Sequence, residues 1–374
     1  MASSEFSPLL LAIDGDSLLH RAHHAYADSE ELGPEGRPAW GLRGLLGFIA
    51  AAAARFTPDG LVVGFDSREH SVRKAAFPAY KAHRPDKPPP LAAQLEDAPL
   101  LLAAAGVPVV SVPGYEADDV LASAAALARR GGWRAVLVTS DRDSFALIDQ
   151  TTSVLRLVNG GIEDSPLLTP AALPAVCGVG ADQYRDYAAL RGDSSDNLPG
   201  VPGFGGKTAA RLLSAFRSLD DVYEAIDDGR GDEVSAVVGK SLTARIASPA
   251  CRADVERNRG LMAMREDLAL PGLTELGLPL DGHRLAAVLA GRDIRLGQSA
   301  WALVGGQRPP WTPPGFDRAP RHLPGGEPPP WAVDWGTPTD ATPPQVAPAA
   351  RPAAAARRPL GRLRPVPAGQ LSLF

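Results

Sequence analysis

Cysteine, lysine and long apolar runs are all scarce in this chain of 374 residues. Cys177 and Cys251 are its two cysteines, which excludes a disulfide framework and favours a reducing compartment. No segment approaches the roughly 20 apolar residues of a membrane span. The first apolar run is short, lacks a basic lead and stops at Asp14, unlike a signal peptide. We therefore expect a cytoplasmic protein.

Lysine is so rare that its positions are informative. Arginine outnumbers lysine 33 to 5, yet Lys74, Lys81 and Lys87 fall in one short segment and a fourth lysine is Lys207. This clustering either marks places that need a compact ammonium group or arises by chance.

The net charge of −5 is unevenly distributed. From Gly305 onward there are eight arginines and four acids, so this region is positive and the preceding body carries about −9. An acidic body argues against nucleic-acid binding unless its acids gather around metal ions.

Apolar segments alternate with helical patterns in the first half of the chain. Strands are predicted at 9–14, 61–66, 107–112 and 133–143, the last running into acids, with helices at 41–56, 91–106 and 116–132. This alternation predicts an α/β fold with a mainly parallel sheet. Each strand leads to an acid at its carboxyl end, where open α/β sheets place their sites.

The second half has a different character. From about residue 181 to 265 the patterns are helical, with a glycine-rich loop between the first two helices. Residues 266–304 suggest a short helical cap. In 305–374, 17 of 70 residues are proline and no hydrophobic period occurs, so we expect a disordered tail.

Nine acids lie at strand ends, first helical turns or the following loop, and each alone could be a helix cap. Two like charges about 4 Å apart repel by about 4 kcal/mol at an effective dielectric of 20, so the group requires cations. Oxygen ligands favour Mg²⁺, with Mn²⁺ able to substitute, and the size of the group suits two ions in phosphoryl transfer. The nine are Asp14, Asp66, Glu116, Asp118, Asp119, Asp141, Asp143, Asp193 and Asp196.

Two motifs suggest other chemistry. AIDGDS matches the start of aspartyl-phosphate phosphatases, with Asp14 as nucleophile and Asp16 as acid, but that reaction leaves the other acids unexplained. VPGFGGKTAA looks like an ATP-binding loop, but Val201 stands where that pattern requires glycine, and no strand precedes it.

The glycine-rich loop instead fits a phosphate contact. Gly203 and Gly205 permit a tight turn, and Lys207 and Thr208 open the next helix, whose free amides attract phosphate. A monovalent cation could bridge the 200–206 turn to phosphate, and an ordinary corner between two helices is the alternative.

A basic strip covers residues 67–87. One aromatic residue, Tyr80, sits beside Lys81, a combination that suits single-stranded nucleic acid, although a solvated charged loop has the same composition. The basic residues are Arg68, Arg73, Lys74, Lys81, Arg84 and Lys87, against two acids.

Successive motifs resemble the 5′-nuclease (flap endonuclease) family, and most of all the 5′→3′ exonuclease domain of bacterial DNA polymerase I. The resemblance covers about residues 9–265, and its motifs are DGDSLLHRAHHAY, VVGFD, SVRKAAFPAYKAHR, GYEADDVLA, TSDRDSFAL and GDSSDNLPGVPGFGGKTAARLL. His20 stands where the family commonly has an aromatic residue, and Phe204 replaces an aliphatic one. No polymerase sequence follows, so we expect a stand-alone enzyme.

The resemblance implies a domain organisation. Residues 1–180 would be a PIN-like nuclease domain with a helical arch at about 68–95, and 181–265 a helix-3-turn-helix DNA-binding subdomain. Residues 266–304 would be an extension and 305–374 the tail.

The resemblance also implies roles for the acids around two divalent metals. Asp14, Asp66, Glu116 and Asp118 resemble ligands of one metal. Asp118, Asp141, Asp143 and Asp196 resemble ligands of the other, with Asp119 and Asp193 as outer or water-mediated ligands.

Roles for basic residues follow in the same way. Lys81 and Arg84 match arch cations that contact the scissile phosphate, and Arg21 matches a cation at the edge of the site. Gly203, Gly205, Lys207 and Thr208 match a turn that grips the DNA backbone.

We therefore expect a two-metal, structure-specific 5′→3′ exonuclease and 5′-flap endonuclease that acts on flapped, nicked or RNA-primed DNA in replication and repair. The alternatives are a non-catalytic scaffold that binds DNA ends and a PIN-type ribonuclease. The complete set of acids argues against the scaffold, and the duplex-gripping turn argues against the ribonuclease.

The last five residues, QLSLF, resemble the short peptide by which bacterial replication and repair enzymes bind the DNA sliding clamp. Leu371, Leu373 and Phe374 could fill apolar clefts while Gln370 forms hydrogen bonds at the rim. A tether from Gly305 to Gly369 would span about 45 Å as a coil. Clamp binding would deliver the enzyme to a nick and let it work with a polymerase in trans. An accidental apolar ending is the alternative.

Overall fold

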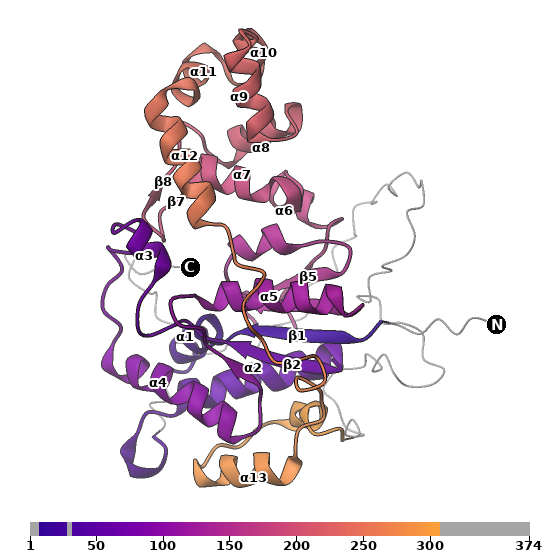
Figure 1. Cartoon of the computed structure of the whole chain (residues 1–374). Helices are drawn as coiled ribbons and strands as arrows, with labels where there is room; N and C mark the ends of the chain where they lie inside the picture. The colour runs from indigo at the N-terminus through magenta and orange to yellow at the C-terminus, as the bar shows by residue number, and fades with distance from the viewer. Residues whose placement is uncertain (1–6, 28–31, 307–374) are drawn as a thin grey trace, which may run out of the picture.

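The computed structural model describes residues 7–27 and 32–306. At its centre is a six-stranded sheet in the order β3-β2-β1-β4-β5-β6 (Figure 1). All neighbouring strands are parallel except β5 and β6, which confirms the predicted α/β fold with a mainly parallel sheet. The strands are β1 (Leu9–Asp14), β2 (Gly60–Gly64), β3 (Val109–Val110), β4 (Arg134–Thr139), β5 (Thr152–Arg156) and β6 (Leu167–Leu168).

Helices cover both faces of the sheet because alternate strand residues point to opposite sides. Leu9, Leu11 and Ile13 share a core with α1, α2 and α4, whereas Leu10 and Ala12 share a core with α5. These helices and the shorter elements near them are α1 (Gly15–Ala25), α2 (Trp40–Phe56), α3 (Val72–Ala76), α4 (Pro89–Ala104), α5 (Ala117–Arg130), α6 (Leu173–Cys177), and the 3₁₀ turns η2 (Pro34–Gly36) and η3 (Asp143–Leu147).

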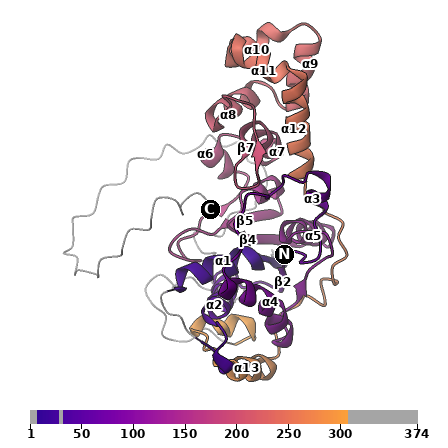
Figure 2. The same cartoon turned by 90° about the vertical axis from the view of Figure 1, so that its left-hand side faces the viewer.

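Helices α7 to α12 form a part that extends away from the sheet (Figures 1 and 2). Its core is continuous with the one that Leu10 and Ala12 share with α5, and it contains Leu212, Leu219, Val234 and Val255, all fully buried. The helices are α7 (Ala181–Arg191), α8 (Gly206–Ala215), α9 (Leu219–Asp227), α10 (Gly231–Val238), α11 (Lys240–Ala247) and α12 (Pro249–Leu261).

A short hairpin of β7 (Gly192–Asp193) and β8 (Leu198–Pro199) joins α7 to the loop before α8. Gly192 has a φ of +75°, and a Cβ placed on it would lie 2.2 Å from the backbone N of Gly200. Only glycine fits this turn, which presents Asp193 and Asp196 toward the α/β part.

Residues 266–304 carry the expected helix, α13 (Gly282–Gly291), and a 3₁₀ turn, η4 (Gln298–Leu303). The chain here returns along the α/β part rather than capping the helical part. Leu61 donates its N–H to the Leu276 carbonyl at 2.8 Å, and Leu285 and Leu303 are buried in the core shared with α2 and α4. This extension therefore completes the sheet domain.

The expected arch, 68–95, contains one five-residue helix, α3, followed by turns and an extended run up to α4. None of the helices in the described ranges has the length and apolar composition that a membrane span requires. The expected tail and its terminal motif lie outside the described residues.

Candidate active site

The predicted acids come together at the carboxyl edge of the sheet. Asp14 ends β1, Asp66 follows β2, and Asp141 and Asp143 follow β4. Glu116 is the N-cap of α5 and forms a capping box with Asp119, which places Asp118 in the first turn beside them. Parallel strands bring these positions to one edge, and the β7–β8 hairpin adds Asp193 and Asp196 from the helical part.

Asp14 is the most deeply held of the strand-end acids. Its Oδ1 accepts the Ser17 N–H at 2.9 Å, as an N-cap does, and its Oδ2 accepts the Thr139 hydroxyl at 2.8 Å. Burial and then the charges of Asp66 and Asp16 outweigh these bonds and raise the pKa of Asp14 to about 8. Asp66 accepts the Ala117 N–H at 2.9 Å, and burial followed by Asp16 raises its pKa too.

Among the residues that the structure describes, two buried carboxylate oxygens have no hydrogen-bond partner: Oδ1 of Asp118 and Oδ1 of Asp143. Burial, followed by the charge of Asp141, raises the pKa of both Asp118 and Asp143 well above its usual value. Buried carboxylates in this state are costly unless a cation neutralises them. The donor set, all oxygen and clustered, fits hard divalent cations such as Mg²⁺.

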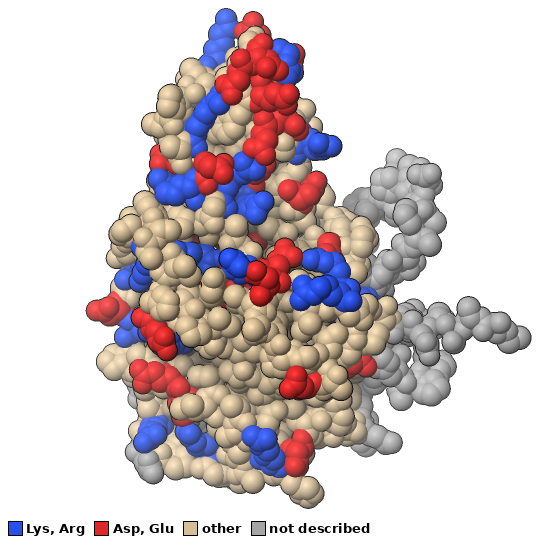
Figure 3. Space-filling model, in the orientation of Figure 1, with Lys and Arg blue, Asp and Glu red and all other residues tan. Residues whose placement is uncertain are grey.

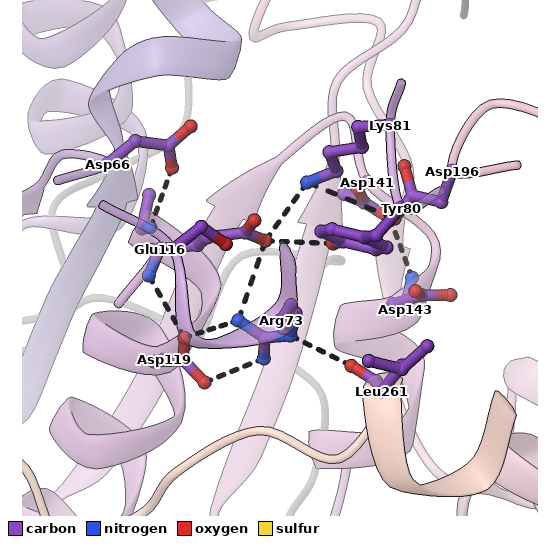
Figure 4. Close-up of polar contacts among 12 residues, drawn as sticks. Asp66, Arg73, Tyr80, Lys81, Glu116, Asp119, Asp141, Asp143, Asp196 and Leu261 are labelled. Carbon is purple, nitrogen blue, oxygen red and sulfur yellow. Dashed lines mark hydrogen bonds and ion pairs between the residues drawn. The ribbon is translucent and has the colours of Figure 1, made fainter. Parts of the chain in front are cut away.

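Basic side chains of the 68–95 segment lie among the acids (Figure 4). Lys81 Nζ lies 2.9 Å from Glu116 Oε2 and 3.9 Å from Asp196 Oδ2. Arg84 lies 2.6 Å from Asp196 Oδ1. Burial alone would lower the pKa of Lys81, but Glu116 and Asp196 raise it, so this lysine stays charged. In the described ranges, as the side chains stand, no group of three or more acidic, histidine or cysteine residues is arranged so that it could hold a metal ion.

Tyr80 does not face a nucleic acid, contrary to the sequence expectation. Its side chain is 3% exposed, and its hydroxyl donates to Glu116 Oε2 at 3.0 Å. Burial and then the Glu116 charge raise the pKa of Tyr80, so the hydroxyl remains a donor. Tyr80 therefore holds Glu116 in position and cannot stack on a base.

Arg73 and Asp119 also differ from expectation. Arg73 forms a double hydrogen bond with Asp119, at 2.7 and 2.8 Å, and donates to the Leu261 carbonyl (Figure 4). Asp119 is fully buried and also accepts the N–H groups of Glu116 and Arg265. Because its guanidinium group is already bonded to Asp119 and Leu261, Arg73 is not free to bind DNA. These bonds instead connect α3 to α5 and to the end of α12.

The remaining predicted residues have varied surroundings. Arg21 donates to Asn159 at 3.1 Å, and Asp193 accepts both the N–H and the hydroxyl of Ser195. Lys74 and Lys207 are exposed. In the turn of the helical part, Gly203 has a φ of +89° and Gly205 caps α8, with Thr208 in its first turn.

Sequence reasoning gave Asp16 and Thr139 no part in this site. Asp16 accepts the Asp66 N–H at 2.7 Å and pairs with Arg68 at 2.5 Å, so it links α1 to the loop after β2. The spacing of Asp16 two residues after Asp14 could have indicated that Asp16 lies close to the site. Thr139 has no comparable signal, because its role depends on the pairing of β1 with β4.

On the face shown in Figure 3, acidic and basic side chains are interspersed over the helical part, and much of the α/β part is uncharged. This view shows no extended surface of one charge. Contacts with a polyanion on this face would therefore depend on local groups of basic residues.

Two family models match the chain. Residues 9–174 match the "5'-3' exonuclease, N-terminal resolvase-like domain" and residues 179–279 the "5'-3' exonuclease, C-terminal SAM fold". DNA polymerase I of Mycobacterium bovis is 35% identical over 263 residues, which are 70% of this chain and 28% of that protein. A protein of Streptomyces coelicolor named 5'-3' exonuclease is 38% identical over 232 residues, 58% of this chain and 75% of that protein. The chain thus spans under a third of the polymerase.

Solved structures share the fold. A bacteriophage T5 flap endonuclease in a complex with DNA and metal ions has a TM-score of 0.54 at 21% identity, over 68% of this chain and 88% of that one. A T5 5'-exonuclease with zinc bound has a TM-score of 0.53 at 21% identity, over 75% and 98%. Because the two family models together match well over half of its length, the chain belongs to the 5'-3' exonuclease family.

Proposed function

We propose that this protein is a 5′→3′ exonuclease and 5′-flap endonuclease that hydrolyses DNA with the help of two divalent metal ions. The observation that carries the proposal is the pair of unpartnered, buried oxygens of Asp118 and Asp143, next to the basic residues Lys81 and Arg84. Family membership and the DNA-bound, metal-bound relatives of the same fold support it.

The divalent ions, Mg²⁺ or Mn²⁺, would polarise the scissile phosphate and offset the charge that develops on it. The residues that would hold them are those predicted from the sequence, apart from Asp119, whose oxygens are already satisfied by Arg73, Glu116 and Arg265. The charges of Asp141, after β4, and of Asp14, at the end of β1, both act on Asp118.

The chain's own basic residues would act on the substrate. Lys81 and Arg84 now neutralise Glu116 and Asp196, so a phosphate placed beside the acids would find both cations within the same site. Preformed positive charge of this kind stabilises a transition state with little reorganisation. Tyr80 would keep Glu116 oriented while Lys81 turns toward the phosphate.

The test is a panel of end-labelled 5′-flap, nicked, RNA-primed and blunt duplexes, incubated with Mg²⁺ and with chelator. We expect 5′ cleavage with Mg²⁺ alone, and loss of cleavage with retained binding for Asp141→Ala. Asp232→Ala is the matched control, because Asp232 is an exposed acid on α10, away from the sheet edge. Binding without cleavage by the unaltered protein would favour the scaffold alternative, and cleavage confined to RNA would favour the ribonuclease.

A second proposal concerns a partner. The QLSLF motif, Gln370 to Phe374, supports binding to a bacterial sliding clamp, with a polymerase acting in trans on the same DNA. Such a contact would be weak alone and would be reinforced by DNA held at the nuclease site. A decapeptide ending in this motif, titrated against purified clamp, should bind in the micromolar to millimolar range. No binding at millimolar peptide, or an unchanged pull-down with Leu373→Ala/Phe374→Ala, would contradict the proposal.

A further inference from the structure

A small cavity lies one strand further along the sheet edge than the acids. Its volume is about 120 Å³, which is room for several waters or for one tetrahedral anion. Three arginines line it: Arg142 from the loop after β4, Arg156 at the end of β5, and Arg191 at the end of α7. No acidic residue lines it.

These arginines differ from others in the chain. Arg129 pairs with Asp149 and Glu266, and Arg252 pairs with Asp227. Within the described ranges, Arg142 and Arg156 form no ion pair or hydrogen bond through their side chains. Arg191 donates only to the neighbouring Gly192 carbonyl and stacks on the Tyr187 ring at 5.5 Å.

Arg142 and Arg156 place two like charges close together in the cavity. Burial and then the charge of Arg142 lower the pKa of Arg156. Burial and then the charge of Arg156 likewise lower the pKa of Arg21, which connects this cavity to the edge of the candidate active site. Arg142 and Arg156 therefore repel each other. For Arg191, burial would lower the pKa, but Tyr184, Tyr187, Asp193 and Asp143 raise it.

A second observation points to a missing polar partner. Tyr184, which lines the same cavity, is 1% exposed, and its hydroxyl has no hydrogen-bond partner. Its ring is fixed by edge contacts with Phe145 at 5.2 Å and by Tyr187 at 5.6 Å. A buried hydroxyl without a partner costs free energy, which an oxyanion in the cavity would recover.

We propose that this cavity binds one backbone phosphate of the substrate DNA, close to the cleaved bond, through Arg142, Arg156, Arg191 and the Tyr184 hydroxyl. Guanidinium groups suit phosphate because they donate two parallel hydrogen bonds. The location favours DNA as the source of the phosphate, since Arg142 lies between Asp141 and Asp143 in the chain. The proposal rests on the proposed nuclease function for its ligand.

The test measures binding, in chelator, of the full-length protein to a 5′-flap duplex at several salt concentrations. Arg156→Gln should weaken binding about tenfold and lower the slope of log K against log salt by about one. Arg129→Gln, which removes an exposed and already paired arginine, should change neither. Tyr184→Phe keeps the ring in the core and should weaken binding without unfolding the protein.

Unchanged affinity and salt slope in both Arg156→Gln and Tyr184→Phe would overturn the proposal. A second outcome would also overturn it: Arg156→Gln abolishes the binding of inorganic phosphate but leaves DNA affinity unchanged. The cavity would then bind free phosphate rather than DNA. Circular dichroism checks that each variant is folded, and Arg156→Lys, which keeps the charge, should fall between Arg156→Gln and the unaltered protein. This test measures binding and not hydrolysis. If the protein shows these binding effects but cleaves none of the substrates of the nuclease test, the nuclease proposal would be contradicted and the phosphate-site proposal would stand.

Discussion

Lys81 and Asp196 contact each other twice, once through the backbone and once through their side chains. The Lys81 N–H donates to the Asp196 carbonyl at 3.0 Å, while its Nζ lies 3.9 Å from Asp196 Oδ2. The backbone of Lys81 is left-handed, with a φ of +54°. This strained conformation costs about 1–3 kcal/mol and is held by the contact with the β7–β8 hairpin. The basic segment and the helical part are therefore fastened together at the acids.

Lys81→Ala should slow cleavage far more than it weakens DNA binding. Its ammonium is buried among the acids, where an added phosphate would meet it, and loss of one such contact commonly costs about 100-fold or more in rate. Lys240→Ala is the control, because Lys240 is an exposed lysine on α11, outside the basic strip. Single-turnover rates and Kd in chelator are measured for both. Equal losses of affinity, with no difference in rate, would show that Lys81 only binds DNA.

Arg73→Ala should act on stability rather than on DNA. Breaking a buried ion pair leaves the fully buried Asp119 uncompensated, which costs about 3–5 kcal/mol. Asp227→Ala breaks only an exposed ion pair with Arg252 and should cost much less than Arg73→Ala. Urea unfolding gives both free energies. A small change for Arg73→Ala together with a large loss of DNA affinity would restore the role expected from the sequence.

Arg73 and Tyr80 show where sequence reasoning reaches its limit. Strands β1 to β4 and most of their terminal acids were predictable, because hydrophobic runs end in Asp14 and Asp66 and parallel pairing then brings them to one edge. Strands β5 and β6 were not predicted. Which group each basic side chain contacts was not predictable from the sequence. Whether an arginine meets DNA or a buried aspartate depends on how α3 packs against α5, and no local pattern records that packing.

Contacts between distant segments were missed for the same reason. Residues 266–304 have no strong periodicity, yet Leu276 joins the edge of the β2 strand by a backbone hydrogen bond to Leu61. The arginines of the cavity come from three separate elements, so only the fold reveals that they are neighbours.

Gly192→Ala should both destabilise the protein and impair the site. A Cβ at this position would need a positive φ and would lie 2.2 Å from the Gly200 N, so we expect a loss of about 2 kcal/mol or more. The hairpin carrying Asp193 and Asp196 would shift, and cleavage should fall. Gly231→Ala is the control, because a Cβ there meets nothing within 4 Å, and it should be neutral or slightly stabilising. Urea unfolding and flap cleavage provide the readouts, and an unaffected Gly192→Ala would mean that the turn is not as tight as described.

Lys207→Ala should weaken binding to duplex DNA without slowing the cleavage of bound substrate. Lys207 is exposed in the first turn of α8, just after the Gly203–Gly205 turn, where helix amides and a lysine together attract a phosphate. Removing one phosphate contact should lower the slope of log K against log salt by about one. Lys240→Ala makes a matched control, since Lys240 is also exposed and opens α11 of the same helical part. Titration of a nicked duplex in chelator at several salt concentrations, followed by single-turnover cleavage at saturating protein, separates the two effects. If Lys207→Ala and Lys240→Ala behave alike, the glycine turn has no special role in gripping DNA.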